Sequence, residues 1–333
     1  MDDSSGQGRL ERWLARALPY APVAIATFWL ARATSRGILA RAGEPAVPLD
    51  DAYIHFQYAR SLAEGRFYAF LPGDGYTSGA TSLLWPALLA PFYAVGFRDT
   101  AIVWAAWLLG WVFLGLLAIE TRRLAMGLLD DLSATGAAAA VIAFGGYTWF
   151  AASGMEVSLL AWLLALAARL SAEWAEKREA RTSRDLAWMV GVAVVAPLSR
   201  PEGMVASLLI ALTLAVFPGE RVRRAPSRVF ALAALLGPLV PPLINKAFTG
   251  HFSTTTTQVK WLVGNPYYGG PHLWAMVRAN LDTFFRVLLD GREWSAIFVP
   301  PGSFPVAIAA VIAVPVVGFR TRRSWRTLMV LAL

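Results

Sequence analysis

Cysteine is missing from this chain of 333 residues, and charged residues are scarce. Without cysteine there can be no disulfide, no thiolate zinc site and no cysteine nucleophile. Charged residues make up 16% of the sequence, against about 25% in soluble domains. So little charge cannot coat a water-facing surface, and we therefore expect a protein that lies in a membrane.

Motifs for nucleotide and hydrolase chemistry are missing as well. The sequence has no P-loop, no GxGxxG opening a helix, no HExxH and no GxSxG. The formal net charge is +8, but the basic residues form short clusters between apolar runs and no continuous stripe. Nucleic-acid binding is therefore not indicated, and membrane topology accounts better for the charge.

Long apolar runs account for most of what is present. Hydrophobic residues make up 57% of the chain, and several runs reach roughly the 17–25 residues that cross a bilayer. No linker or repeat divides them, so we predict one all-α domain over 1–333, a polytopic transmembrane helical bundle. An apolar run that starts near 327 stops at the chain end, and we expect further helices beyond it. The predicted segments are 13–38, 81–97, 101–119, 134–152, 155–172, 186–198, 203–217, 229–248, 296–318 and 327 onward.

Basic clusters predict the orientation of these segments. Arginines and lysines before the first run and near 122, 177–184, 221–228 and 320–326 belong in the cytoplasm by the positive-inside rule. The polar loops 41–80 and 250–293 are then outside, with the hairpin tips 152–156 and 198–203. From the first loop to Arg122 the chain must cross an odd number of times. One of 81–97 and 101–119 is therefore interfacial or re-entrant, or the rule fails there.

Two features of the outer side indicate a site. The first loop is rich in aromatic residues, which predicts short amphipathic helices on the membrane surface. The segment 186–198 is too short to cross, so its tip, with Pro197 and Pro201, should lie below the surface. Irregular backbone at that depth is tolerated where it lines a polar cavity. We therefore expect the two loops and the two tips to converge on an outer pocket.

Four acidic residues are the main chemical candidates. Asp50 and Asp51 can serve as a general base or a metal site. Equally, Asp50 suits the N-cap of a following helix with Asp51 in its first turn. Glu156 and Glu202 lie at predicted helix breaks, where an ionised group near the bilayer core is costly. For Glu202, a local pair with Arg200 or a helix cap is an equal alternative.

The second outer loop adds a cation. In "STTTTQVK", residues 253–260, hydroxyls precede Lys260, and such a group suits a phosphate. The aromatic residues that follow suit the faces of sugar rings. An ordinary solvated loop is the alternative interpretation, and the two histidines of this loop are too far apart for a local metal motif.

Four motifs in order resemble a known group of enzymes. They are "DDAYIHFQYARSLAEGRFYAF" followed by "GYTSGATSLLWP", then "ASGMEVSL" at 152–159, "LSRPEG" at 198–203, and, more weakly, "STTTTQVK". Over about 50–260 the chain is similar to bacterial GT-C glycosyltransferases. The most similar type is the arabinofuranosyltransferase/mannosyltransferase-like group, which uses polyprenyl-phosphate sugars.

The resemblance implies a multi-pass enzyme of the bacterial plasma membrane with its active site facing the periplasm or exterior. It implies inverting transfer of a hexose or pentose from a polyprenyl-phosphate donor to a hydroxyl of a glycan, lipid or protein. An aspartate of the first loop is the family's base, and we favour Asp50, with Asp51 as its partner or as a ligand of Mg²⁺ or Mn²⁺. The same resemblance gives substrate-binding roles to Glu156, Arg200, Glu202, Lys260 and Arg60.

The resemblance also has a gap and two competitors. Arginine often stands in that group where this chain has Gln57, so the donor-phosphate contact at this position is unassigned. A transporter or flippase of lipid-linked glycans could use the same pocket without chemistry, although no internal repeat is visible. A non-catalytic membrane subunit with the same fold is the third interpretation.

Overall fold

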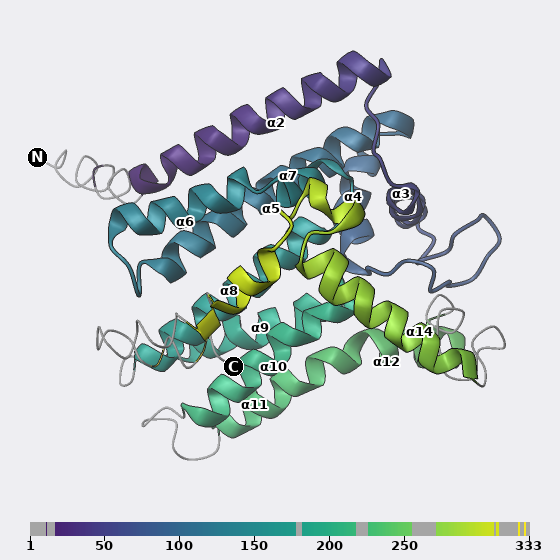
Figure 1. Ribbon diagram of the computed structural model, residues 1–333. Coiled ribbons are helices and arrows are strands. Elements are labelled where there is room, and N and C mark those ends of the chain that lie inside the picture. Colours follow the sequence, from purple (N-terminus) through teal and green to yellow (C-terminus); the bar gives the residue numbers. More distant parts are fainter. Residues whose placement is uncertain are drawn as a thin grey trace, which may run out of the picture.

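The computed structural model describes residues 11, 17–177, 182–217, 226–254, 271–309, 311–312, 326 and 330. All regular secondary structure among these residues is helical (Figure 1), which confirms the predicted all-α class. The α-helices are α2 (Ala21–Ala42), α3 (Asp50–Ala63), α4 (Leu84–Ala94), α5 (Ile102–Ala125), α6 (Asp131–Ala143), α7 (Gly145–Ala152), α8 (Val157–Glu176), α9 (Ser183–Ser199), α10 (Met204–Val216), α11 (Pro226–Leu236), α12 (Val240–Thr249) and α14 (Pro271–Asp282). Shorter helical turns are η1 (Leu18–Tyr20), η2 (Asp99–Ala101), η3 (Pro201–Gly203), η4 (Gly237–Leu239) and η6 (Glu293–Ile297), with a π-helix, η5 (Thr283–Leu289).

Three stretches of the described chain are long and apolar enough to cross a membrane: Asp99–Ala125, Val157–Glu176 and Val229–Thr249. A fourth is possible if α6 and α7, which meet at a bend of 54°, form one broken span. The prediction of one continuous segment at 134–152 is wrong there, because the pair Gly145–Gly146 lies directly at the bend. These helices are consistent with the predicted membrane protein.

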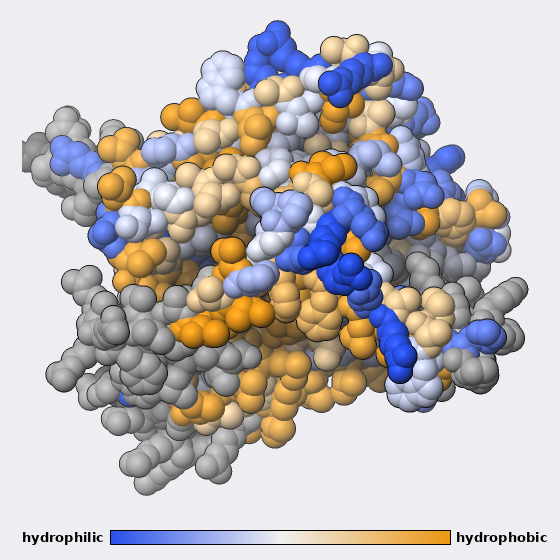
Figure 2. Space-filling view, viewed as in Figure 1, coloured by the Kyte–Doolittle hydropathy of each residue, from blue (hydrophilic) through white to orange (hydrophobic). Residues whose placement is uncertain are grey.

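The outer surface of α10, α11 and α12 supports the same conclusion. Figure 2 shows apolar side chains over these helices, whereas hydrophilic side chains gather at the opposite edge and around α3. An apolar surface of this extent is rare on a soluble monomer. The large exposed apolar side chains of the three helices include Leu208, Leu212, Leu232, Leu235, Leu236 and Leu243.

Several of the predicted apolar segments, among them 13–38, 81–97 and 203–217, are not among the membrane-crossing candidates. Helix α2, with 22 residues, covers most of the predicted 13–38 segment, but Arg32, Arg36 and Arg41 lower its hydropathy. Helix α4 has 11 residues, about 16 Å at 1.5 Å per residue, against the ~30 Å of a hydrocarbon core. Of the two segments that left the topology open, only 101–119 therefore lies in a helix long enough to cross.

Other predicted boundaries need correction. Helix α9 has 17 residues rather than 13, because a capping box of Thr182 and Asp185 starts it earlier. The predicted loop 250–293 holds α14 and η5, so much of it is helical. The apolar segment predicted at 296–318 starts with a turn, and helix is found from Ser303. In the predicted 41–80 loop there is one short helix, α3.

The core lies around α5, which packs against α8, α6 and α7. Small residues allow the close contacts: a Cβ added to Gly110 would lie 2.2 Å from the carbonyl oxygen of Ala151. Helices α5 and α7 therefore touch backbone to backbone. This contact holds the end of α7 in place, next to the break that carries Glu156.

Candidate functional site

Helix α3 is amphipathic, and its apolar face sets the position of the site. Ala52, His55, Phe56 and Ala59 are all buried and follow one another at helical spacing. The residue that precedes the helix in N-cap position is Leu49, which makes no side-chain capping bond. The expectation that Asp50 is the N-cap was therefore one residue late: Asp50 and Asp51 are the first two residues of the helix. Negative side chains are stabilised there by the helix dipole.

The first partner of α3 is the break between α7 and α8. Two buried indoles hold its backbone: Trp85 Nε1 donates to the carbonyl of Gly154 at 2.9 Å, and Trp107 Nε1 donates to that of Ala152 at 2.8 Å. Glu156 is the residue just before α8, and its side chain is fully buried. The predicted hairpin tip at 152–156 is therefore confirmed as a turn inside the protein.

The second partner is the break between α9 and α10. Arg200 has an extended backbone (φ −163°, ψ 153°) and joins α9 to η3. Gly203 ends this turn, and a Cβ there would lie 2.1 Å from the carbonyl oxygen of Ala196. Only glycine permits so close a return of the chain, and this return directs the Arg200 side chain towards Glu156.

His55, Glu156, Arg200 and Glu202 form one charged group, called the Glu156 cluster below. Arg200 Nη1 donates to Glu156 Oε1 at 2.8 Å. The same guanidinium donates through Nε and Nη2 to the two oxygens of Glu202, at 3.2 and 3.1 Å. His55 Nε2 lies 3.2 Å from Glu156 Oε2. Three elements that are far apart in the sequence therefore meet at one carboxylate.

Burial and charge act in opposite directions on Glu156. Burial raises the pKa of this carboxyl, but the contact with His55 and the charge of Arg200 outweigh that effect. The pKa of Glu156 therefore lies below its ordinary value of 4.5. The carboxylate is ionised at neutral pH and serves as the anion that holds α3 and the two breaks together.

This lowered pKa makes a prediction for stability in acid. Since the folded pKa is below the unfolded one, the stabilisation by Glu156 is complete above pH 4.5 and is lost as the pH falls through the folded value. The thermal midpoint of the wild type should exceed that of Glu156→Gln by a constant amount near neutral pH. The difference should shrink below pH 4.5. A difference that grows in acid would contradict the assignment of Glu156 as the anion.

A cavity of about 540 Å³ lies beside the start of α3. The segment before Asp50, with Val47 and Pro48, forms one wall, and α7 contributes Thr148 and Trp149. The opposite walls come from α2 and from the turn at Ile297 and Phe298. Its volume is in the range of small-molecule sites, about 300–1,000 Å³. Its lining ends at Pro48, two residues before Asp50, and includes neither aspartate.

The two aspartates themselves are exposed. Asp50 Oδ1 accepts a hydrogen bond from the backbone N–H of Asp51 at 2.9 Å. Asp51 precedes His55 by four residues, so the two side chains share a face of α3. The aspartate pair is thereby linked to the Glu156 cluster by one helical turn.

Of the two remaining predicted residues, Arg60 lies away from this group and Lys260 lies outside the described residues. Arg60 is ten residues after Asp50, about 15 Å along the helix, and its Nε pairs with Glu64 at 3.0 Å. The structure therefore does not bring Arg60 to the cluster. Gln57, the position that departs from the family pattern, donates to the carbonyl of Phe70 at 2.6 Å and holds the loop after α3.

The first loop touches the end of α12, the helix that precedes the predicted second loop. The rings of Tyr76 and Phe248 are stacked with centroids 5.0 Å apart, and Phe67 lies 4.9 Å from Phe248. Phe248 is in the last turn of α12, directly before the second loop. This aromatic contact fixes where the second loop leaves the bundle, on the same side as α3.

His55 is the member of the cluster that the sequence analysis did not assign. A signal was available, because His55 falls on the apolar face of α3 between Ala52 and Phe56. A titratable side chain on the buried face of a helix needs a polar partner. The only available clue to that partner was the predicted convergence of α3 with the tip that carries Glu156.

Within the described part of the chain, no group of three or more His, Asp or Glu side chains is arranged to hold a metal ion. Asp50 and Asp51 can offer two carboxylates to a divalent cation, and further oxygen ligands would have to come from substrate or water. The predicted role of Asp51 as a cation ligand stays a prediction.

Comparison with models of protein families, with curated proteins and with solved structures gave no match for this chain. The structure itself defines a class: an all-α protein with apolar helices of membrane-spanning length. Its candidate site is a buried ionic cluster where one amphipathic helix meets two helix breaks.

The α7–α8 break gives a prediction for stability. Gly154 has φ +79°, and a Cβ there would lie 2.9 Å from Val47 Cγ1 and 3.1 Å from Ala52 Cβ. Gly43 has φ +78° but open space around it. Gly43→Ala should cost about 1–2 kcal/mol through backbone strain alone, and Gly154→Ala about 1–3 kcal/mol more through crowding. Equal losses in denaturant unfolding would show that α3 does not press on this turn.

Proposed function

We propose that this protein is a membrane glycosyltransferase of the GT-C type. It transfers a hexose or pentose from a polyprenyl-phosphate donor to an acceptor hydroxyl. In this proposal the chain is a polytopic bundle in the bacterial plasma membrane. In this proposal the site faces the periplasm or exterior, because the basic clusters at 177–184, 221–228 and 320–326 lie at the opposite ends of the predicted spans.

One observation carries the proposal: the motif containing Asp50 and Asp51, the turn with Glu156 and the turn with Arg200 meet in space. These are three of the four motifs by which the sequence resembles the glycosyltransferase group. If each motif resembled the glycosyltransferase group only by chance, there would be no reason for the three motifs to meet around one buried carboxylate. A cavity of about 540 Å³ ends at Pro48, two residues before Asp50, and is large enough for a ligand, but no residue of the Glu156 cluster lines it.

The proposed chemistry needs a single base. The carboxylate of Asp50 takes the proton of the acceptor hydroxyl as its oxygen attacks the anomeric carbon of the donor sugar. The bond from that carbon to the phosphate oxygen breaks, and the electron pair leaves with polyprenyl phosphate. Attack from the face opposite the leaving group inverts the anomeric centre. Asp51, which is exposed at the start of α3, acts as the partner of Asp50 or as a cation ligand.

The remaining groups position and neutralise. Charge develops on the leaving phosphate, so a nearby cation lowers the barrier. Lys260 is the proposed phosphate contact. Arg200 is already bound by two carboxylates, so its proposed role is to hold Glu156 and Glu202 in place, and the exposed carboxylate of Glu202 can accept from sugar hydroxyls. Glu156 and His55 are positioning residues that fix α3. Arg60 has no assigned contact with donor or acceptor.

The class of activity can be tested on the full-length protein in proteoliposomes. Polyprenyl-phosphate donors with radiolabelled pentose or hexose are supplied, and both free polyprenyl phosphate and the location of intact donor are followed. The proposal expects donor cleavage with label in an acceptor. Movement of intact donor between leaflets without cleavage would instead identify a flippase. A protein that neither cleaves nor moves any donor would correspond to the non-catalytic subunit.

A further inference from the structure

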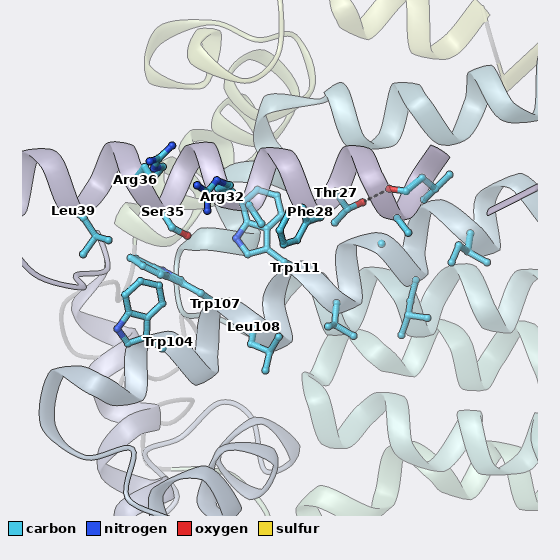
Figure 3. Close-up of a pocket in the computed structure, with 17 residues that line it drawn as sticks. Thr27, Phe28, Arg32, Ser35, Arg36, Leu39, Trp104, Trp107, Leu108 and Trp111 are labelled. Carbon is cyan, nitrogen blue, oxygen red and sulfur yellow. Dashed lines mark hydrogen bonds between the residues drawn. The ribbon is translucent and has the colours of Figure 1, made fainter. Parts of the chain in front are cut away.

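A groove of about 660 Å³ runs between α2 and α5, separate from the candidate site (Figure 3). Its walls are mostly apolar, with Phe28 and Leu39 from α2 and Leu108 and Val112 from α5. Helix α2 makes far fewer contacts with α5 than α8 does. Helix α2 is therefore only loosely packed on α5, and the groove lies between these two helices.

Charge is concentrated at one end of the groove. Arg32 and Arg36 lie one helical turn apart on α2, at the end where Trp104 and Trp107 also lie (Figure 3). Both arginines are exposed, and neither has an ion-pair partner among the described residues. Within the described part of the chain, no Asp or Glu lines the groove. An anion would therefore balance the positive charge at this end of the groove.

A second, independent observation points to a ligand. Trp111 is 95% buried, since its exposed fraction is 5%, and its Nε1–H has no hydrogen-bond partner among the described residues. The indole lines the same groove as Arg32 and Ser35 (Figure 3). A buried donor left unpaired costs free energy. An acceptor oxygen in the groove would satisfy it.

The length of the apolar part fits a lipid chain in one leaflet of a bilayer. From Arg32 to Val23, the far end of the lining on α2, there are nine residues, about 14 Å along a helix. Half of a ~30 Å hydrocarbon core is about 15 Å. An acyl chain that starts at a headgroup held by Arg32 therefore reaches the end of the groove at the middle of the bilayer.

We propose that this groove binds one anionic glycerophospholipid of the surrounding membrane. Its phosphate contacts Arg32 and Arg36, a headgroup or ester oxygen accepts from Trp111 Nε1–H, and an acyl chain lies along Phe28 and Leu108. The lipid takes the place of a protein contact between α2 and α5. The lipid phosphate is the counter-ion of Arg32 and Arg36. Without it, these two charges make α2 poorly suited to a bilayer.

Native mass spectrometry of the full-length protein in detergent tests this site with phosphatidylglycerol and phosphatidylcholine of identical chains. Phosphatidylglycerol should bind the wild type more tightly. Arg32→Gln/Arg36→Gln should weaken its binding by about 30-fold, since each cation near a membrane surface contributes about fivefold. Binding of phosphatidylcholine should hardly change. Arg41→Gln is the matched control, because Arg41 is exposed on α2 but does not line the groove.

A second variant keeps the test decisive if the double variant does not fold. Ser35→Trp leaves both arginines in place but fills the groove between them, and it should also abolish preferential phosphatidylglycerol binding. Unchanged preference in either folded variant would overturn the site. A third titration uses polyprenyl phosphate. If it binds more tightly than phosphatidylglycerol with the same dependence on Arg32 and Arg36, the assignment to a glycerophospholipid is wrong.

Discussion

Replacing Arg200 by alanine is expected to lower the free energy of unfolding by about 3–5 kcal/mol. The reason is that Glu156 is fully buried and would lose its direct guanidinium partner at 2.8 Å. A buried carboxylate without a counter-ion must either stay charged at high cost or take up a proton. Denaturant unfolding of the purified protein in detergent micelles measures the loss.

The matched control is Arg60→Ala. Arg60 also forms an ion pair, with Glu64, but the pair is exposed and lies within one helix. Its removal should cost at most about 1 kcal/mol. Adding Glu156→Gln to Arg200→Ala should recover part of the loss, because the unpaired charge is then gone. If Arg200→Ala is no more destabilising than Arg60→Ala, the cluster does not hold the two breaks together.

Replacing Asp50 by asparagine is expected to slow sugar transfer by about 10²–10⁴-fold, the usual contribution of a general base. Because Asp50 is exposed and accepts only from the neighbouring Asp51 N–H among the described residues, the fold should be unaffected. The rate of polyprenyl phosphate release from labelled donor, with acceptor in excess, measures this effect. Asp51→Asn distinguishes a base from a partner: as a partner or cation ligand, Asp51 should contribute less than Asp50.

Glu44→Gln is the matched control for both variants. Glu44 is exposed, lies six residues before Asp50 and has no ion-pair partner among the described residues. It should leave the rate unchanged. Full activity in both Asp50→Asn and Asp51→Asn would show that this motif does not supply the general base. A larger loss in Asp51→Asn would exchange the two roles.

The helical bundle could be predicted from the sequence where apolar runs have clear ends. Residues 155–172 and 229–248 are examples, since their runs correspond to spans in the structure. Helix α14 was missed because its residues, such as His272 and Arg278, are too polar for an apolar run. The bend at Phe144 was also missed, although the pair Gly145–Gly146 marks it in the sequence. Its position depends on how closely α7 approaches α5 at Gly110.

The candidate site was predictable in part, for a different reason. Glu156 and Glu202 stand out as charges between apolar runs, and Arg200 is adjacent to Glu202 in the sequence. Their meeting with α3 follows from the predicted orientation of the loops. The sequence could not show that Arg200 contacts Glu156 across 44 positions, because that contact depends on the tight turn at Gly203. Nor could it show that Glu156 reaches His55 rather than Asp51.

The most direct measurement of the central claim is the anomeric configuration of the sugar in the product. The full-length wild type is incubated with a polyprenyl-phosphate sugar of known configuration and an acceptor, and the product is examined by NMR before it can react further. One aspartate base without a nucleophile predicts complete inversion relative to the donor. A product with retained configuration, which requires a covalent glycosyl-enzyme and a second displacement, would contradict the account.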